Sequence, residues 1–296
     1  MKRILFLFLF VMTLFSAACA EETLIPPLDA AKAYPAVVGG YTSDTHYQDD
    51  TLEVSLTTDR YLDCDIWIAE VRISNPGQIR SAFCGAYTSG KTAGADKIAR
   101  RVGAVLACNG DYCNFHPDTG VVIRNGKQYR KRPNKKNDVL LIDTSGTMRV
   151  VVSPTKDSFN TVYDEMGGPA ETGGTILHAL TFGPALIQNG EFAHDHFVRP
   201  DNGHRSLAQR MVIAQREPMS FLLIACSGPE SRDSRGMTLD EMAQYVMTLD
   251  VTTAYNLDGG SSATLVFDGE KINSLDTGKT RAVSDILYFS TAVKPS

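Results

Sequence analysis

The sequence predicts an α+β fold: a single domain with a mixed, strand-rich sheet core and a few packed helices. Many short apolar segments have strand character, and few show a helical period. Their order along the chain is irregular, which argues against a doubly wound parallel sheet. No internal repeat, low-complexity tract or obvious linker interrupts the sequence, so one domain is the simpler interpretation.

The first part of the chain is expected to supply several strands and one helix. Residues 21–64 are expected to form an extended lead-in and first strands, and the alternation at 66–73 predicts a half-buried strand. A short helix is expected at 95–102. The apolar run 103–108 then predicts a buried strand that leads into a polar turn.

The rest of the chain predicts further strands and one clear helix. The Asn125-Gly126 pair is typical of a β-hairpin turn, and Thr238 with Glu241 forms a capping box before an amphipathic helix. A glycine-rich loop is expected at 165–174 and a long polar loop at 193–206. Strands or strand-and-turn units are expected at 139–143, 148–152, 182–190, 211–214, 221–226, 251–257 and 265–272.

The first twenty residues have the pattern of an export signal. Two basic residues precede an apolar stretch at 4–15, and Ala18-Cys19-Ala20 matches a small-residue cleavage site. The stretch is shorter than the roughly 20 residues that a membrane-spanning helix needs, so stable membrane insertion is not expected. A lipoprotein anchored through Cys19 is the alternative to cleavage after Ala20. We expect a protein that is secreted or exported to the cell envelope.

The charge balance gives no sign of a nucleic-acid partner. The formal net charge is −5, and removing the two basic residues of the signal makes it −7. The basic run at 130–132, followed by Lys135 and Lys136, lies beside Asn and Pro, which indicates a solvated turn. Nucleic acid is therefore not expected as a partner, and the oligomeric state cannot be read from the sequence.

Five cysteines remain after removal of the signal: Cys64, Cys84, Cys108, Cys113 and Cys226. Export favours at least one disulfide, but the odd number leaves one thiol over and the pairing cannot be deduced. The spacing Cys108-x4-Cys113-x2-His116 offers a metal site as an alternative, yet it lacks the paired knuckles of a zinc site. A disulfide or buried core cysteines are the favoured interpretations.

Three loops at the ends of predicted strands carry polar residues beside glycine, one of them the sequence around Gly183-Pro184. Asn109-Gly110-Asp111 follows the strand at 103–108, and Asp258-Gly259-Gly260-Ser261-Ser262 follows the strand at 251–257. A sheet fixes the backbone at such points while the loop remains accessible, and glycine lets a ligand approach the backbone closely. The alternative for the second loop is a hairpin turn capped by Asp and Ser.

Several arginines stand at the starts of apolar segments: Arg205 or Arg210, Arg235, and Arg281. Such a residue is usually a solvated residue at a strand edge. A guanidinium near a Gly/Ser loop also suits a phosphate group, because its fork donates two hydrogen bonds to phosphate oxygens.

Six motifs follow one another in order: Ala107-Cys-Asn-Gly-Asp-Tyr112, Phe182-Gly-Pro-Ala-Leu-Ile-Gln-Asn-Gly190, Gln209-Arg-Met-Val-Ile-Ala214, Ser234-Arg-Gly-Met-Thr-Leu239, Asn256-Leu-Asp-Gly-Gly-Ser-Ser262 and Arg281-Ala-Val-Ser-Asp285. Together they resemble the phosphodiester glycosidase family. The resemblance covers roughly residues 65–290, which we interpret as one domain. The third motif keeps the family's arginine but has Ala214 where relatives commonly have glycine.

The resemblance implies hydrolysis of the bond between a sugar anomeric carbon and phosphate in a carbohydrate phosphodiester. This chemistry needs a carboxylate beside a cation-like sugar carbon and groups that hold the departing phosphate. We assign Asp258 as the catalytic carboxylate, Asp111 as the second one, and Arg210 and Arg281 to the phosphate. The other substrate-binding residues are then Asn109, Gly110, Gly259, Gly260, Ser261 and Ser262. No metal and no cofactor is expected.

Two other functional classes remain open. His194-Asp-His196, with His204 and Asp201 nearby, offers the donors of a metal-dependent phosphodiesterase, although a polar loop with solvated histidines explains the same pattern. A cell-wall glycan-binding module without catalytic activity is the second alternative. A serine hydrolase is disfavoured, because no Gly-x-Ser-x-Gly elbow occurs in the sequence.

Overall fold

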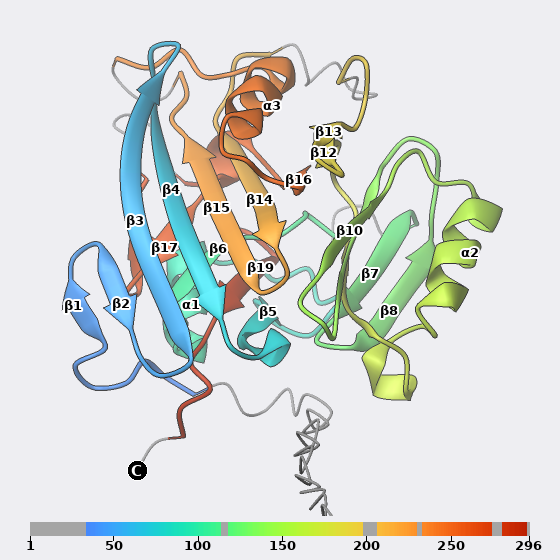
Figure 1. The fold of residues 1–296 in the computed structure, drawn as a ribbon, viewed down its shortest axis with the longest axis horizontal. Coiled ribbons are helices and arrows are strands. Elements are labelled where there is room, and N and C mark those ends of the chain that lie inside the picture. Colours follow the sequence, from blue (N-terminus) through green and yellow to red (C-terminus); the bar gives the residue numbers. More distant parts are fainter. Residues whose placement is uncertain (1–33, 114–117, 198–205, 230–232, 274–279, 295–296) are drawn as a thin grey trace, which may run out of the picture.

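The computed structural model describes residues 34–113, 118–197, 206–229, 233–273 and 280–294. Within these residues, three antiparallel sheets pack with three α-helices (Figure 1). The predicted strand-rich α+β fold is confirmed. The export signal at 1–20 and most of the lead-in lie outside the described residues. No described helix is both long and apolar enough to cross a bilayer.

The largest sheet has nine strands in the order β1-β2-β3-β4-β15-β14-β16-β12-β13. Its centre is regular: β3 and β4 pair continuously from Leu52 opposite Ile73 to Tyr61 opposite Cys64. The strands are β1 (Tyr41–Ser43), β2 (His46–Gln48), β3 (Leu52–Tyr61), β4 (Cys64–Ile73), β15 (Ser220–Cys226), β14 (Arg210–Glu217), β16 (Thr253–Asn256), β12 (Ala185–Gln188) and β13 (Glu191–Phe192).

Two five-stranded sheets lie against the large one. One has the order β10-β9-β11-β7-β8 and the other the order β18-β17-β6-β19-β5. The strands of the first are β10 (Met148–Val151), β9 (Val139–Asp143), β11 (Ile176–Leu180), β7 (Gly120–Arg124) and β8 (Lys127–Arg132). Those of the second are β18 (Glu270–Lys271), β17 (Leu265–Phe267), β6 (Leu106–Asn109), β19 (Asp285–Phe289) and β5 (Ile79–Phe83).

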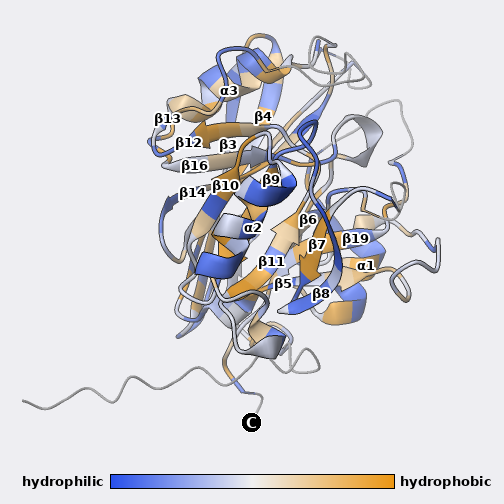
Figure 2. Cartoon of the chain, turned by 90° about the vertical axis from the view of Figure 1, so that its right-hand side faces the viewer, coloured by the Kyte–Doolittle hydropathy of each residue, from blue (hydrophilic) through white to orange (hydrophobic). Residues whose placement is uncertain are grey.

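Alternating side chains divide the core into layers. On β14, Ile213 faces a cluster shared with the two small sheets, whereas Val212 faces a second cluster under helix α3 (Leu239–Met247). Helix α1 (Ala95–Val102) covers the β6 sheet and α2 (Lys156–Glu165) covers the β9 sheet. Figure 2 shows the result, with hydrophobic strands inside and hydrophilic residues on the outer turns of α2.

Local turn and cap signals were reliable guides to these elements. Asn125 and Gly126 adopt positive φ angles of 51° and 78° in the predicted hairpin turn. The Thr238 hydroxyl accepts from the Glu241 N–H at the start of α3, as the capping box predicts. Helix α2 was not predicted, although Thr155 and Ser158 form a similar capping box there.

One prediction from the sequence is wrong, and the structure decides between two interpretations of the cysteines. The basic run at 130–132 lies in strand β8 instead of a solvated turn, and Arg130 is 9% exposed. No disulfide links these five cysteines: Cys64, Cys84, Cys108, Cys113 and Cys226 are all thiols. All but Cys84 are buried, and burial raises the pKa of the Cys108 thiol. They are core residues, the other interpretation that the sequence left open.

Candidate active site

The side chain of Asn109 joins the loop at 109–111 to the loop at 258–262. This residue ends β6 and is fully buried. Its Nδ2 donates to the Asp258 carbonyl oxygen at 2.7 Å, and its Oδ1 accepts from the Thr264 N–H at 3.0 Å. One amide therefore fixes both ends of the turn that carries Asp258, Gly259, Gly260, Ser261 and Ser262.

The segments that carry the two predicted phosphate-binding arginines reach the same turn. The Gly260 N–H donates to the Gln209 carbonyl at 2.9 Å, and the Arg281 N–H donates to the Ser261 carbonyl at 2.8 Å. Backbone contacts thus bring residues 109, 210, 258 and 281 into one region, although they are far apart in the sequence. Their individual roles stay predictions.

The two arginine side chains differ in their surroundings. Arg210 is buried, and its guanidinium donates to the carbonyls of Met237 at 2.9 Å and Ser206 at 2.7 Å. Arg281 is exposed. Arg210 therefore also holds the backbone of neighbouring segments, whereas the Arg281 side chain is accessible to a ligand.

The turn itself buries polar groups. Asp258 is 7% exposed and Ser262 is fully buried. Among the described residues, neither the Ser262 hydroxyl nor the Asn256 Oδ1 has a hydrogen-bond partner. Gly259 is required here, because a Cβ at this position would lie 2.8 Å from the Gln209 carbonyl oxygen. Buried polar atoms without a protein partner are rare and mark positions that a ligand or water can satisfy.

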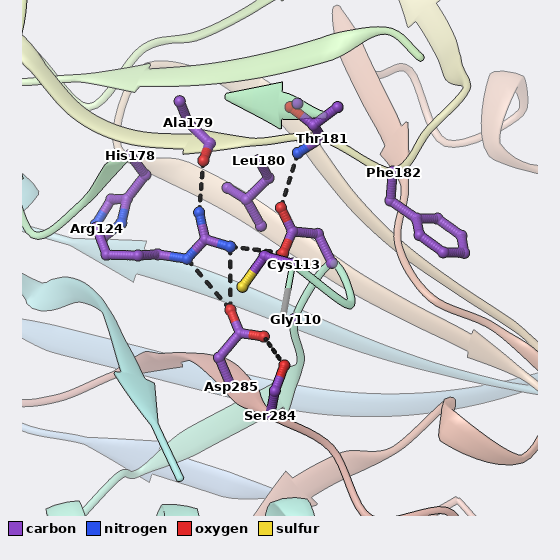
Figure 3. A network of polar contacts seen from close by, with 12 residues as sticks. Gly110, Cys113, Arg124, His178, Ala179, Leu180, Thr181, Phe182, Ser284 and Asp285 are labelled. Atoms are coloured by element: carbon purple, nitrogen blue, oxygen red, sulfur yellow. Dashed lines mark hydrogen bonds and ion pairs between the residues drawn. The ribbon is translucent and has the colours of Figure 1, made fainter. Parts of the chain in front are cut away.

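A buried charge cluster adjoins this turn (Figure 3). The Arg124 guanidinium, at the end of β7, donates to Asp111 Oδ1 at 2.6 Å and to Asp285 Oδ2 at 3.0 Å. It also donates to the Ala179 carbonyl of β11. Asp111 is held from its other side by the Thr181 N–H, at 2.7 Å from Oδ2. The three charged side chains are almost completely buried.

Gly110 packs directly against this cluster. Its N–H donates to the Asp285 carbonyl at 2.9 Å, and a Cβ there would lie 2.5 Å from the Asp285 carboxylate. Only glycine lets β6 pass so close to Asp285. The position therefore links the charge cluster to Asn109, its immediate neighbour.

Burial dominates the protonation of Asp285. Loss of solvent raises the pKa of Asp285 to about 6, with a further increase from the negative charge of Asp111, while Arg124 lowers it. For Arg124, burial works against the charge, but Asp111 and Asp285 outweigh it and raise the pKa above its usual value. The cluster holds one permanent cation between two carboxylates.

This cluster bears on the role assigned to Asp111. Both of its oxygens accept hydrogen bonds, and the side chain is 1% exposed. Such geometry suits a residue that positions the strand end after Asn109. Its predicted function as the second catalytic carboxylate stays a prediction.

The same residues supply the donors that could hold a metal. Among the described residues, Asp111, Cys113 and Asp285 place ligand atoms within 4.8 Å of one another. A metal site needs a thiolate, yet burial raises the pKa of Cys113 well above its usual value. The Arg124 guanidinium also binds both carboxylates. The donor set thus fits a guanidinium better than a metal ion.

The histidines considered as metal ligands lie elsewhere. His194 Nε2 lies 2.6 Å from Oδ2 of the buried Asp138. His194 and His196 line a pocket of about 390 Å³ together with Lys135 and Lys136. His116, His204 and Asp201 lie outside the described residues. The Asp138 contact occupies one ring nitrogen of His194, and two lysines nearby disfavour a bound cation.

Sequence reasoning missed several members of this region. Arg124 and Asp285 were not among the predicted site residues, and neither was His178, which lies beside Arg124 in Figure 3. One signal was present: Arg124 follows the apolar run Val121-Val-Ile and precedes a hairpin turn. A charge in an apolar strand needs a buried partner, but the sequence alone does not reveal which one.

The sequence matches a family model and part of a protein from Bacillus subtilis. The family model described as phosphodiester glycosidase matches residues 102–290. A Bacillus subtilis (strain 168) protein, the SPbeta prophage-derived uncharacterized protein YomE, is 33% identical over 81 residues. That match spans 27% of this chain and 12% of the relative, so it concerns a small part of the Bacillus protein.

Solved structures share the fold. The catalytic domain of zebrafish N-acetylglucosamine-1-phosphodiester alpha-N-acetylglucosaminidase, auto-inhibited by its pro-peptide, superimposes with a TM-score of 0.60 at 18% identity, covering 88% of this chain and 87% of that one. A hypothetical protein from Synechocystis gives a TM-score of 0.51 at 16% identity, covering 84% and 64%. A putative exported protein from Burkholderia pseudomallei K96243 gives 0.50 at 14%, covering 77% and 74%.

Because His178 is buried, we expect the free energy of unfolding to depend on pH in the acid range. Its Nδ1 accepts from the Asn125 N–H and its Nε2 donates to the Ile79 carbonyl. Burial lowers the pKa of His178 to about 3. The unfolded state therefore binds the extra proton between about pH 3 and 6.5, and stability is lost as pH falls, with a slope up to about 1.4 kcal/mol per pH unit. We expect His178→Gln to remove this slope.

The measurement is urea unfolding of both proteins between pH 4 and 7. Asp285 contributes the opposite slope, because its raised pKa makes stability fall as pH rises from about 4 to 6. Subtracting the variant from the wild type cancels that contribution. If the free energy of unfolding had the same pH slope in the wild type and in His178→Gln, this would contradict the claim that His178 is buried in its neutral form.

Gly110→Ala tests the link between the charge cluster and Asn109. The new methyl group would collide with the Asp285 carboxylate, so we expect a loss of about 1–3 kcal/mol of stability. Thermal or urea unfolding measures this loss. Ser284→Ala is the control, because it removes a hydrogen bond to Asp285 without adding an atom. A Gly110→Ala variant as stable as the wild type would contradict the packing argument.

Proposed function

Because the chain belongs to the phosphodiester glycosidase family, we propose that it is an exported hydrolase that cleaves the bond between a sugar anomeric carbon and phosphate. The observation that carries the proposal is the hydrogen bond from Asn109 to Asp258. It joins two of the family-like motifs at one place, beside the segments of Arg210 and Arg281. The expected substrates are sugar-1-phosphodiesters of envelope or capsule glycans.

The proposed reaction breaks one bond and forms one. Water adds its oxygen to the anomeric carbon and loses a proton to solvent or a carboxylate. The bond from this carbon to the phosphate oxygen breaks, and the phosphate leaves as a monoester of the second alcohol. A phosphate monoester is a good leaving group, so the main demand falls on stabilising the cation-like sugar carbon.

The residues of the turn supply what this reaction requires. Asp258 provides a carboxylate that can face the sugar carbon, either as nucleophile or as charge stabiliser. The exposed Arg281 can hold the departing phosphate through its two-pronged guanidinium. The buried Ser262 hydroxyl and Asn256 Oδ1 offer hydrogen bonds to a water bound inside the turn. Asp111 and Arg210 hold the neighbouring backbone in place: Asp111 accepts from Arg124 and from the Thr181 N–H, and Arg210 donates to two backbone carbonyls.

Other functional classes give different results in simple assays. A metal-dependent phosphodiesterase would lose activity in chelator and regain it with added metal. A glycan-binding module would bind substrate without releasing product. The proposed enzyme releases free sugar and a phosphomonoester in the presence of chelator, and a screen of sugar-1-phosphodiesters with different sugars measures both products.

Asp258→Asn is expected to lower kcat by at least about 100-fold, because it removes the charge that stabilises the cation-like transition state. The substitution is nearly isosteric, so the unfolding temperature should change little. Asp250→Asn is the matched control: Asp250 is exposed and has a positive φ that Asn tolerates. An Asp258→Asn enzyme with wild-type kcat would rule out Asp258 as the catalytic carboxylate.

Arg281→Lys should weaken cleavage of a sugar phosphodiester more than cleavage of an aryl glycoside of the same sugar. Lysine keeps the charge but cannot donate two parallel hydrogen bonds, and the aryl glycoside has no phosphate to hold. Comparing kcat/KM for the two substrates gives the ratio. Equal losses on both would show that Arg281 does not hold phosphate.

Arg210→Lys should behave differently. The guanidinium of Arg210 donates to two backbone carbonyls, so lysine should lower the unfolding temperature as well as the activity on both substrates. Thermal unfolding alongside the two assays measures this. An unchanged unfolding temperature would contradict the supporting role that we assign to Arg210.

A further inference from the structure

We propose that a basic, aromatic pocket beside Asp111 binds an anionic sugar unit of the substrate, next to the bond that is cleaved. The pocket measures about 640 Å³ and lies between strand β8 and the segment around Tyr87. We call it the Tyr129 pocket, after Tyr129 in its wall. This inference rests on the proposed function and identifies what surrounds the reacting phosphodiester.

The pocket is connected to the candidate active site through the chain segment that follows Asp111. Cys113, which lines the pocket, follows Asp111 by two residues. The buried Arg130 guanidinium donates to the Cys113 carbonyl at 3.1 and 3.2 Å and to the Gly120 carbonyl at 3.3 Å. Arg130 therefore fixes the backbone just after Asp111. A ligand in the Tyr129 pocket would contact Cys113, four residues after Asn109.

Tyr87 lines the pocket, and the charges of the buried cluster influence its hydroxyl. Burial raises the pKa of the Tyr87 hydroxyl, which also interacts with Arg130, with Arg124 and with Asp111. Tyr87 thus lies within electrostatic reach of both the pocket and the buried charge cluster.

The wall of the pocket is aromatic. The Tyr87 and Tyr129 ring centroids are 4.8 Å apart, and Phe83 packs against both at 5.4 and 5.2 Å. Both tyrosines are half-buried, so their rings are partly accessible. Such rings combine an apolar body with a polar hydroxyl, which matches the apolar face and hydroxyl edge of a pyranose.

The rim of the pocket is cationic. Arg130, Lys131 and Arg132 line it, and none of its described lining residues is acidic. The Lys131 ammonium also lies over the Tyr163 ring at 3.4 Å, and Arg132 pairs with the exposed Asp118 at 3.4 Å. Lys127 adds a further positive charge over the Tyr129 ring, at 5.7 Å. Aromatic rings beside guanidinium and ammonium groups suit a sugar that carries phosphate or carboxylate.

The volume suits one such sugar unit, because small-molecule sites occupy about 300–1,000 Å³. The substrate is therefore a glycan with negative charge beyond the phosphate that is cleaved. Phosphorylated sugars and uronic acids share this chemistry, and direct binding measurements distinguish them.

The test is calorimetric titration of the full chain with four probes: glucose 6-phosphate, glucuronate, glucose and inorganic phosphate. We expect one of the two anionic sugars to bind more tightly than both glucose and phosphate. The variant K131Q/R132Q should weaken that binding by about tenfold, as the loss of one charge-assisted contact does. Tyr87→Leu should weaken the binding of that anionic sugar as well. The affinity for inorganic phosphate should not depend on Tyr87.

The matched control is R149Q/K156Q, which removes the same charge from exposed positions on β10 and α2. It should leave binding within about twofold, because long-range charge effects are screened by salt. Equal weakening by the two double variants, equal affinity for phosphate and sugar phosphate, or no binding of either anionic sugar would each overturn the proposal.

A kinetic measurement separates this inference from the proposed function. On a sugar-1-phosphodiester whose second alcohol is methanol, K131Q/R132Q should keep the wild-type kcat/KM, because the pocket is not used. A general loss on this substrate would overturn the inference. If the wild type fails to cleave any sugar-1-phosphodiester, the proposed function fails, while the binding titration still decides whether the pocket holds an anionic sugar.

Discussion

The guanidinium of Arg124 is the interaction on which the site depends. It connects Asp111 after β6, Asp285 on β19 and the Ala179 carbonyl on β11, so one side chain joins the two small sheets. All three charged side chains are almost completely buried. Removing the guanidinium would leave two buried carboxylates without a cation, a loss typically of about 3–5 kcal/mol. Asn125 with Ser81 and His178 with Ile79 add hydrogen bonds across the same junction.

Two contacts connect this junction to the turn that carries Asp258. Gly110 lets β6 pass against Asp285, which fixes the position of Asn109, and Asn109 then binds the carbonyl of Asp258. The turn that presents Asp258 is thus held by a buried amide and, through it, by the charge cluster. Such rigid support keeps catalytic groups in place without further reorganisation during the reaction. Arg281 is exposed beside this turn, and the Tyr129 pocket is lined by Cys113, two residues after Asp111.

Much of the fold could be predicted because its signals are local. Apolar periodicity identified β4, β9, β14 and β15, and turn chemistry identified the hairpin at Asn125-Gly126. The strands that were missed include β11 and β19, whose apolar runs are interrupted by His178 and begun by Asp285. Those polar residues are buried only because distant partners satisfy them. The loops at 109–111 and 258–262 were recognisable by glycine and carboxylate spacing, but the buried Arg124 that supports them depends on tertiary contacts.

The central claim is that the bond broken is the one between carbon and oxygen at the anomeric centre. Turnover of a sugar-1-phosphodiester in water enriched in oxygen-18 tests it directly. The account predicts that the label enters the released sugar at its anomeric carbon and that the phosphomonoester carries none. Label in the phosphomonoester instead would show attack at phosphorus and would contradict the account, even though the two products would be chemically the same.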